Sequence, residues 1–451
     1  MIGLKSTFPS NSLEDWIVQL KKDLKGDDFS KLLRQDEIEE IEFPTFHHAD
    51  SGAIVNQVPG KYPFTRGIKS SNNNGWNNGH LIHVTEEKIA NHKALELLMK
   101  GCDLLIFDLS NSLSYDWSKL FEEIYFEHIT VQIKLSKSEH FDSLKSYFQN
   151  EIPKTIQFNC DFLNQENAEL FEQLAKYSFT RQFPFCLVDG FSVQQTGATT
   201  WQEIAFCLSS GNTYLNRLIH AGFTIDQAAA CIHFSIGIGS NYFMEIAKIR
   251  ALKQVWAAVI KEYKPVHNCT FNCVINANIG WTNKSLLDPH TNLLRQTTEV
   301  MSAISGGIDT IIVHPYDSLS ANGTSVLAER MALNIPLILK EESYFDGVID
   351  PLGGSYVVEE LTQKIAKKAW HFFQSLEEQG GIFNQEAQNI LATSVHSKAE
   401  LKIAEIRDGK KTLIGINKYP NNSPESNYFL KQKTYLGMQQ LIFERALIAI
   451  Q

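Results

Sequence analysis

Eight polar side chains end or follow the apolar segments of this sequence, and their types are those that carry chemistry in many proteins. They are five carboxylates and amides of short reach, one longer amide, one hydroxyl and one imidazole: Asp108, Asp161, Asp189, Asp317, Asn276, Gln194, Ser192 and His314. Such groups can form a nucleophile with its base, or a carboxylate pair. Here no serine, histidine and acid occur in an assignable order. Helix capping and loop hydrogen bonds explain most of these residues.

Short motifs that suggest a cofactor fail on their spacing. "GIGSNY" (237–242) resembles a dinucleotide loop, but Tyr242 stands where the third glycine is needed for close helix packing. "GGSY" (353–356) lacks the lysine of a phosphate loop. His80 and His83 lie three residues apart without a third ligand for a metal. We assign no catalytic, substrate-binding, cofactor-binding or metal-binding residue from these motifs.

The elements that must position these side chains are strands and helices in alternation. Between the strand-length runs lie helix-like stretches, and the clearest of them, at 241–263, repeats apolar residues every three or four positions. Strands that alternate with helices pair in parallel, and eight such units close a (β/α)8 barrel. We therefore predict an α/β fold, a TIM barrel, whose eight strands lie at 81–84, 103–109, 129–135, 155–159, 185–190, 231–237, 270–275 and 310–315.

The two ends of the chain depart from the alternation. Residues 1–60 are predicted to form an N-terminal arm, with an amphipathic helix at 13–26. The barrel is assigned to 61–400, and further helices are expected at 288–307 and 359–381. Residues 401–451 are interpreted as a C-terminal linker followed by a short helix.

Composition limits the classes of partner. The formal charge of -10 and the 43% hydrophobic content indicate a globular protein that binds neither nucleic acid nor anionic membrane surfaces. The sequence has neither a signal-peptide pattern nor 18 consecutive apolar residues. Seven cysteines, an odd number, lie mostly in apolar segments, and the spacing of Cys269 and Cys273 matches neither a redox pair nor a zinc knuckle. We expect reduced core thiols in a cytoplasmic protein.

Five segments together resemble one family, the adenosylcobalamin-dependent acyl-CoA mutases, and most closely the methylmalonyl-CoA mutase family. They occur in the family's order between residues 59 and 417: "PFTRG" (63–67), "GATTWQEIAFCLSSGNTYL" (197–215), "GIGSNYFMEIAKIRA" (237–251), "DPHTNLLRQTTEVMSAISGG" (288–307) and "DPLGGSYVVEELT" (350–362). The resemblance implies a barrel that binds acyl-CoA along its axis. It also implies a separate flavodoxin-like domain whose cobalamin starts a radical rearrangement.

At the positions that bind substrate in this family, the sequence departs from the pattern. The histidine that contacts the substrate carbonyl corresponds to Ser192, a shorter and uncharged group. The family's CoA-binding arginine and serine correspond to Cys231 and His233. No tyrosine lies between Tyr62 and Tyr115 to match the family's substrate-contacting tyrosine. Each lost charged hydrogen bond weakens substrate binding by about 1 to 3 kcal/mol.

The cobalamin side is altered in the same way. A glutamine and a histidine near the cofactor correspond to Ala277 and Ile275, and the run "IKSSNNNGWNNGH" (68–80) is interpreted as filler in place of substrate contacts. The cobalamin domain's signature, Asp-x-His-x-x-Gly, is missing. The nearest string begins at Asp288 and has Leu293 where the glycine is required.

Together these features predict a non-catalytic small subunit of a heterodimeric methylmalonyl-CoA mutase. The large subunit would be its partner and would carry adenosylcobalamin, while this chain would bind no cofactor. Two alternatives remain open: a catalytic mutase barrel whose cobalamin domain is on a separate chain, and a free-standing binding or chaperone-like barrel. We also predict that side chains such as His233 and Phe234 block the barrel interior, leaving no axial tunnel.

Overall fold

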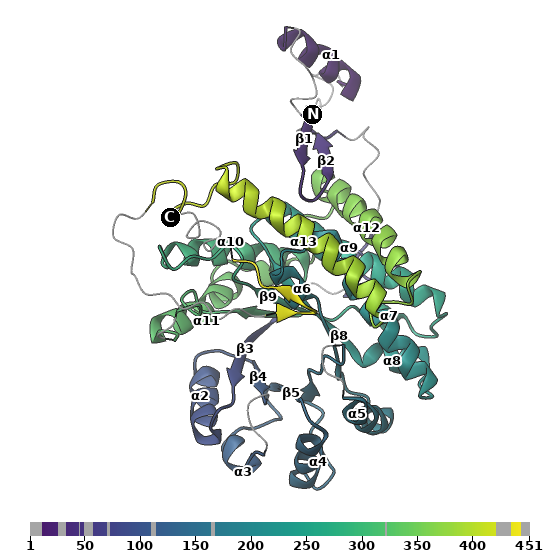
Figure 1. Cartoon of the computed structure of the whole chain (residues 1–451), viewed down its shortest axis with the longest axis vertical. Helices are drawn as coiled ribbons and strands as arrows, with labels where there is room; N and C mark the ends of the chain where they lie inside the picture. The colour runs from purple at the N-terminus through teal and green to yellow at the C-terminus, as the bar shows by residue number, and fades with distance from the viewer. Residues whose placement is uncertain are drawn as a thin grey trace, which may run out of the picture.

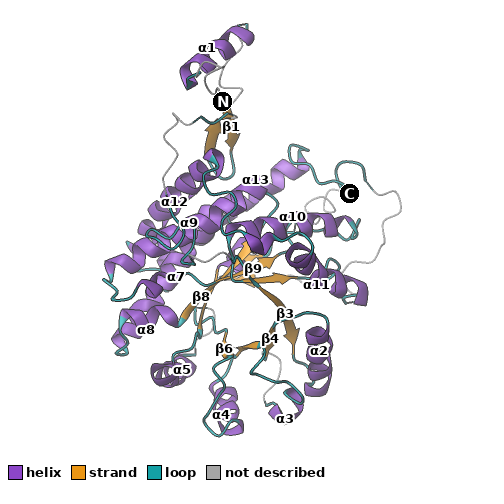
Figure 2. Cartoon of the chain, turned by 180° about the vertical axis from the view of Figure 1, so that it is seen from behind, coloured by secondary structure: helices purple, strands orange, loops and turns teal. Residues whose placement is uncertain are grey.

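A computed structural model describes residues 11–25, 33–44, 46–48, 57–69, 73–109, 114–163, 167–320, 323–420 and 434–442. Within these residues, eight parallel strands form a sheet that helices surround (Figures 1 and 2). The strands are β3 (Asn77–His83), β4 (Leu104–Asp108), β5 (Thr130–Lys134), β6 (Ile156–Phe158), β7 (Cys186–Asp189), β8 (Ile232–Ile238), β9 (Ile275–Ile279) and β10 (Thr310–Val313).

The sheet closes into a barrel. Its strand order is β6-β5-β4-β3-β10-β9-β8-β7, so β6 and β7 are the two end strands. A parallel bridge between Cys160 and Cys186 joins them, and the Cys160 amide donates to the Phe185 carbonyl at 3.2 Å. The predicted TIM barrel is confirmed.

The helices around the barrel follow the strands in the expected alternation. They are α2 (Glu87–Met99), α3 (Trp117–Leu120), α4 (Ser138–Tyr147), α5 (Ala168–Arg181), α6 (Gly190–Gln195), α7 (Thr200–His220), α8 (Ile225–Ala230), α9 (Tyr242–Glu262), α10 (Thr291–Gly306), α11 (Val326–Glu341), α12 (Tyr356–Glu377) and α13 (Gln385–Arg407). The predicted helices at 241–263, 288–307 and 359–381 are confirmed as α9, α10 and α12.

One predicted strand is misplaced. Residues Asn268–Phe271 form a 3-10 helix, η4, rather than the start of a strand, and β9 begins only at Ile275. The β9 start is fixed by Asp309, whose carboxylate accepts from the Ile275 amide at 2.9 Å. The apolar run at 270–275 therefore extends from the bottom of the barrel into the strand.

The Asn and Gly run at 68–80 is not filler, which corrects the interpretation made from sequence. Its last four residues open β3. The Asn78 amide is buried and donates to the Leu333 carbonyl of α11 at 3.2 Å. Gly79 allows the neighbouring strand to approach, because a Cβ there would lie 3.0 Å from Cγ2 of Thr310. In this strand, an asparagine amide hydrogen-bonds to a helix, and a glycine lets the neighbouring strand approach closely. These contacts take the place of apolar packing.

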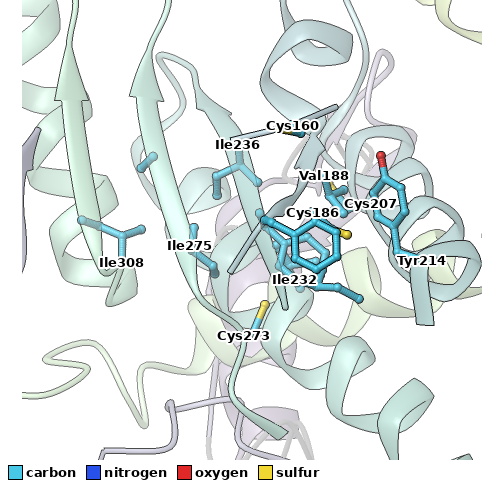
Figure 3. Packing of buried hydrophobic residues seen from close by; sticks show 14 of the residues in the cluster. Cys160, Cys186, Val188, Cys207, Tyr214, Ile232, Ile236, Cys273, Ile275 and Ile308 are labelled. Carbon is cyan, nitrogen blue, oxygen red and sulfur yellow. The ribbon is translucent and has the colours of Figure 1, made fainter. Parts of the chain in front are cut away.

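The core lies between the barrel strands and the helices, and outward-facing strand residues supply it. On β8, Phe234 packs against Trp256 of α9 with ring centroids 4.9 Å apart. The prediction that Phe234 blocks the interior is therefore wrong, because successive side chains of a strand point to opposite faces. Figure 3 shows part of this core, where Cys186, Val188 and Cys207 lie together.

Polar contacts join the N-terminal hairpin to the barrel. It consists of β1 (Leu33–Asp36) and β2 (Ile41–Pro44), paired antiparallel. The buried carboxylate of Glu39, in its turn, accepts from the amide and hydroxyl of Thr200 at 3.0 and 2.6 Å, at the first turn of α7. Glu40 pairs with Lys368 at 2.7 Å and with Lys398 at 2.5 Å.

Unlike the hairpin, the helix before it does not pack into the barrel. The predicted helix at 13–26 is confirmed as α1 (Leu13–Asp23), which a capping box between Ser12 and Asp15 starts. α1 has no buried residue and projects from the barrel body (Figure 1). Trp16 stacks on Phe46 with centroids 4.3 Å apart.

At the C-terminal end, a second hairpin crosses the barrel mouth (Figure 1). It consists of β11 (Thr434–Tyr435) and β12 (Met438–Gln439), and the Leu441 amide after it donates to the Gln195 carbonyl at 2.7 Å. α13 runs through the predicted boundary at residue 400. The short final helix expected near the end of the chain lies outside the described residues.

The burial of the cysteine thiols agrees with what the sequence predicts. All seven cysteines are free and every one except Cys269 is buried, which confirms core thiols. Burial raises the pKa of the Cys231 thiol to about 11. In the described parts of the chain, no helix has both the length and the apolarity to cross a bilayer.

Candidate functional site at the barrel mouth

A cavity of about 450 Å³ lies at the carboxyl ends of the strands, where catalysis takes place in barrels of this class. Six of the eight polar positions picked from sequence line it: Asp108, Asp161, Asp189, Ser192, Asn276 and His314. Gln194 and Asp317 do not. Gln194 lines a smaller pocket behind the wall, and the Asp317 carboxylate accepts from the Ser325 amide at 3.0 Å near the start of α11.

Asp189 and Ser192 form one wall of the cavity as a helix cap. Asp189 ends β7 and caps α6, accepting from the Ser192 amide at 3.2 Å and its hydroxyl at 2.5 Å. Burial raises the pKa of the Asp189 carboxyl, and the bonds from Ser192 oppose that rise. Ser192, which stands where the resemblance places a histidine, thus donates its hydroxyl to a neighbouring residue.

Asp161 connects the cavity to the C-terminal hairpin. The Tyr435 hydroxyl donates to Asp161 Oδ2 at 2.9 Å, and burial raises the pKa of Tyr435 well above its usual value. Tyr435 therefore stays protonated as a donor. Sequence reasoning missed this residue because it lies far along the chain, in a two-residue strand with no motif around it.

Among the described residues that line the cavity, Lys134 is the single lysine or arginine, and it faces three aspartates. Its Nζ lies 3.4 Å from Asp108 Oδ2, and His83 Nδ1 lies 3.3 Å from the same oxygen. A low-dielectric cavity strengthens the repulsion between carboxylates and an anionic guest. The lining therefore disfavours the phosphates and carboxylate of an acyl-CoA.

Three flat side chains form an aromatic wall of the cavity. Phe191 lies parallel to His314 with centroids 5.7 Å apart, and Trp281 lies 4.4 Å from His314 and 5.6 Å from Phe191. Two hydrogen bonds hold Trp281 in place: its amide donates to Gln195 Oε1 and its ring nitrogen to Ser318 Oγ, each at 2.8 Å. This aromatic wall was not recognised from sequence, because its members follow three different strands, β7, β9 and β10.

Below the cavity, a buried polar chain fills the barrel interior. His233 Nε2 contacts Asn159 Oδ1, the Asn159 amide donates to Gln132 at 2.8 Å, and the Gln132 amide donates to Gln157 at 3.2 Å. Burial lowers the pKa of His233 to about 4, so the imidazole is neutral at pH 7. The prediction that His233 occupies the interior is confirmed. Its neighbours across the axis are amides rather than the expected aromatic ring.

Two residues matched to the cobalamin side face away from the mouth. Ile275 and Ala277 are fully buried in the outer core, whereas Asn276 and Asn278 on the same strand line the cavity. The alternation of a strand explains the difference, because a shift of one position moves a side chain to the other face. Cys231, matched to a CoA-binding arginine, is buried, and its thiol donates to the Gln227 carbonyl at 3.3 Å.

The fold and the cavity define a (β/α)8 barrel with its pocket at the carboxyl face. A profile of the family described as methylmalonyl-CoA mutase matches residues 128–440. The "Methylmalonyl-CoA mutase small subunit" of Porphyromonas gingivalis is 31% identical over 93% of this chain and 71% of its own length. The chain belongs to the methylmalonyl-CoA mutase family.

Other relatives share shorter parts. A "Probable methylmalonyl-CoA mutase small subunit" of Mycobacterium bovis is 35% identical over 52% of this chain and 38% of its own length. A "Methylmalonyl-CoA mutase" of Cereibacter sphaeroides is 26% identical over 91% of this chain and 64% of its own length. The chain therefore spans about two thirds or less of the length of several curated relatives.

Proposed function

We propose that this chain is the non-catalytic small subunit of a heterodimeric methylmalonyl-CoA mutase. The large subunit binds adenosylcobalamin and acyl-CoA and interconverts succinyl-CoA and (R)-methylmalonyl-CoA. This barrel serves as the folded partner against which the large subunit assembles. Two relatives whose names contain "small subunit" support the proposal.

The observation that carries the proposal is the character of the cavity. An acyl-CoA needs cations for its phosphates and a donor for its thioester oxygen. The lining offers three aspartates against Lys134, and the Ser192 hydroxyl donates to Asp189. Below the cavity, the hydrogen-bonded side chains from His233 to Gln157 occupy the barrel axis that the CoA tail would follow.

The residues at the mouth do not fit cobalamin either. In this family the cofactor domain sits against the barrel mouth, and here the hairpin with Tyr435 covers part of that face. The strand positions that face the cavity offer asparagine at 276 and 278 rather than groups suited to the corrin. We assign adenosylcobalamin to the large subunit for this reason.

The test is expression of this chain alone and together with a methylmalonyl-CoA mutase large subunit. We expect a one-to-one complex by native mass spectrometry, mutase activity in the complex, and neither activity nor acyl-CoA binding by this chain in calorimetry. Tight acyl-CoA binding by the chain alone would indicate a catalytic barrel. Failure to copurify with any large subunit would indicate a free-standing protein.

A substitution inside the complex separates a catalytic barrel from an inactive one. Ser192→Ala removes the hydroxyl that stands at the family's substrate position, and we expect mutase activity within about twofold of wild type. The corresponding position of the large subunit is the control, where replacing the histidine lowers kcat. A fall of a hundredfold or more with Ser192→Ala would show that this barrel takes part in the chemistry.

A further inference from the structure

The cavity at the mouth has the features of a binding site rather than of a filled remnant. Its volume of about 450 Å³ lies in the range of small-molecule pockets. Its walls combine an aromatic surface with a few polar groups, as such pockets do. Its charge is the reverse of what an acyl-CoA requires.

One polar group in the cavity has no hydrogen-bond partner among the described residues. Asn276 is 2% exposed, and its Oδ1 accepts no hydrogen bond. The residue faces the barrel interior from β9, between Ser235 of β8 and Thr310 of β10. An unsatisfied buried acceptor costs free energy that a donor on a ligand would recover.

The charged groups point to the same kind of ligand. Asp161 and Asp189 both line the cavity, where the Asp161 carboxylate accepts from the Tyr435 hydroxyl, the Asp189 carboxylate accepts from the Ser192 hydroxyl, and the Lys134 ammonium acts on Asp189. A cation between the two would be attracted to both, more strongly than in water. It would also oppose the rise that burial causes in the pKa of Asp189.

The aromatic wall suits the remainder of such a ligand. The faces of Trp281 and Phe191 attract cations and pack against flat or aliphatic groups. Both side chains line the same cavity as the two aspartates. A ligand with an ammonium at one end and an apolar body at the other can contact both the aspartates and the aromatic side chains.

We propose that the barrel mouth binds a small organic ammonium compound, with its cation at Asp161, Asp189 and Asn276 and its apolar body against Trp281 and Phe191. The hairpin with Tyr435 covers the site and holds Asp161 in place. This inference rests on the proposed non-catalytic role. The site would take no part in mutase catalysis, and ligand binding here would regulate the complex with the large subunit.

The test uses three probes of the same shape and different charge. The full chain is titrated by calorimetry in phosphate buffer with 2-phenylethylammonium, neutral 2-phenylethanol and anionic phenylacetate. We expect saturable one-to-one binding of the ammonium, at least tenfold weaker binding of the alcohol, and none of the carboxylate. Equal binding of all three, or no binding of the ammonium at millimolar concentration, overturns the proposal.

Variants locate the site. Asp161→Asn keeps an acceptor for Tyr435 and removes the charge, and Asp189→Asn does the same for Ser192. Each should weaken ammonium binding at least tenfold, while Asp142→Asn on the exposed face of α4 leaves it unchanged. Thermal unfolding without ligand checks that each variant is folded. Unchanged affinity in both cavity variants refutes the site, whereas acyl-CoA binding by the chain would refute only the subunit assignment.

Discussion

At the scale of single residues, several buried ionisable groups are paired in sets whose members come from distant parts of the barrel. Arg250 is fully buried and pairs with Glu359 at 2.6 Å and with Asp350, which Arg66 also contacts at 2.7 Å. His233 is neutral in the interior because burial lowers its pKa. Each group is therefore expected to affect the free energy of unfolding in its own way.

Replacing Arg250 by methionine should destabilise the protein by about 3 to 5 kcal/mol, because two buried carboxylates lose their main counterion. Urea unfolding measures the difference. Lys100→Met serves as control. Lys100 forms an exposed pair with Glu96 one helical turn away, and its loss should cost less than about 1 kcal/mol. A similar cost for both variants would mean that Arg250 is not the counterion of a buried set.

His233 predicts a pH dependence whose sign follows from its pKa. The folded pKa is about 4 and the ordinary value is 6.5, so between these values the unfolded chain binds the additional proton. Stability therefore falls as pH drops through this window, by up to about 1.4 kcal/mol per pH unit from this residue. His233→Gln keeps a donor for Asn159 and should lower the slope of unfolding free energy against pH. His396→Gln, on the exposed side of α13, should leave the slope unchanged.

At the scale of elements, β3 shows how a polar sequence becomes a barrel strand. Asn78 hydrogen-bonds a helix carbonyl and Gly79 admits Thr310 of the adjoining strand. Hydrogen bonds and close backbone packing therefore stabilise this strand in place of buried apolar side chains. An apolar pattern is therefore not required for a strand.

Gly79→Val should destabilise the protein by about 1 to 3 kcal/mol, because Thr310 and Ile312 leave no room for the added atoms. Gly347→Val is the matched control. An added Cβ at Gly347 meets nothing within 4 Å, so its effect should stay within about 0.5 kcal/mol. Guanidinium unfolding of both variants gives the comparison. Equal stability would mean that β3 does not pack closely against β10 at Gly79.

At the scale of the whole molecule, the arm divides into an anchored and a projecting part. Glu39 and Glu40 attach the hairpin to α7, α12 and α13, while α1 has no buried residue and exposes Val18 by 63%. A projecting helix with one apolar face and no buried residue suits an interface. We expect α1 to contact the large subunit.

Removal of residues 1–25 should leave the unfolding midpoint of the isolated chain unchanged, because none of the described residues in this segment, 11–25, is buried. The same deletion should weaken the complex with the large subunit at least tenfold in surface plasmon resonance. Control replacement of Glu40 by alanine loosens the hairpin itself and should lower the unfolding midpoint. An intact complex without α1 would place the interface elsewhere.

The sequence by itself determined the architecture. Alternating apolar runs fixed eight strands, repeats of three or four residues fixed α9, and the motif segments pointed to the family. It also placed Ser192 and the aspartates at strand ends, because the carboxyl ends of parallel strands meet on one face. These are local patterns, and each is readable within about twenty residues.

Only the tertiary structure decided what those residues do together. It turned Phe234 outward and Asn276 inward, since a one-residue shift in a strand changes the face. It brought Tyr435 to Asp161 across 274 positions and Trp281 to Phe191 across the mouth. Such contacts depend on how distant elements pack, and no spacing along the chain encodes them. The charge of the cavity, on which both proposals rest, is a property of that packing.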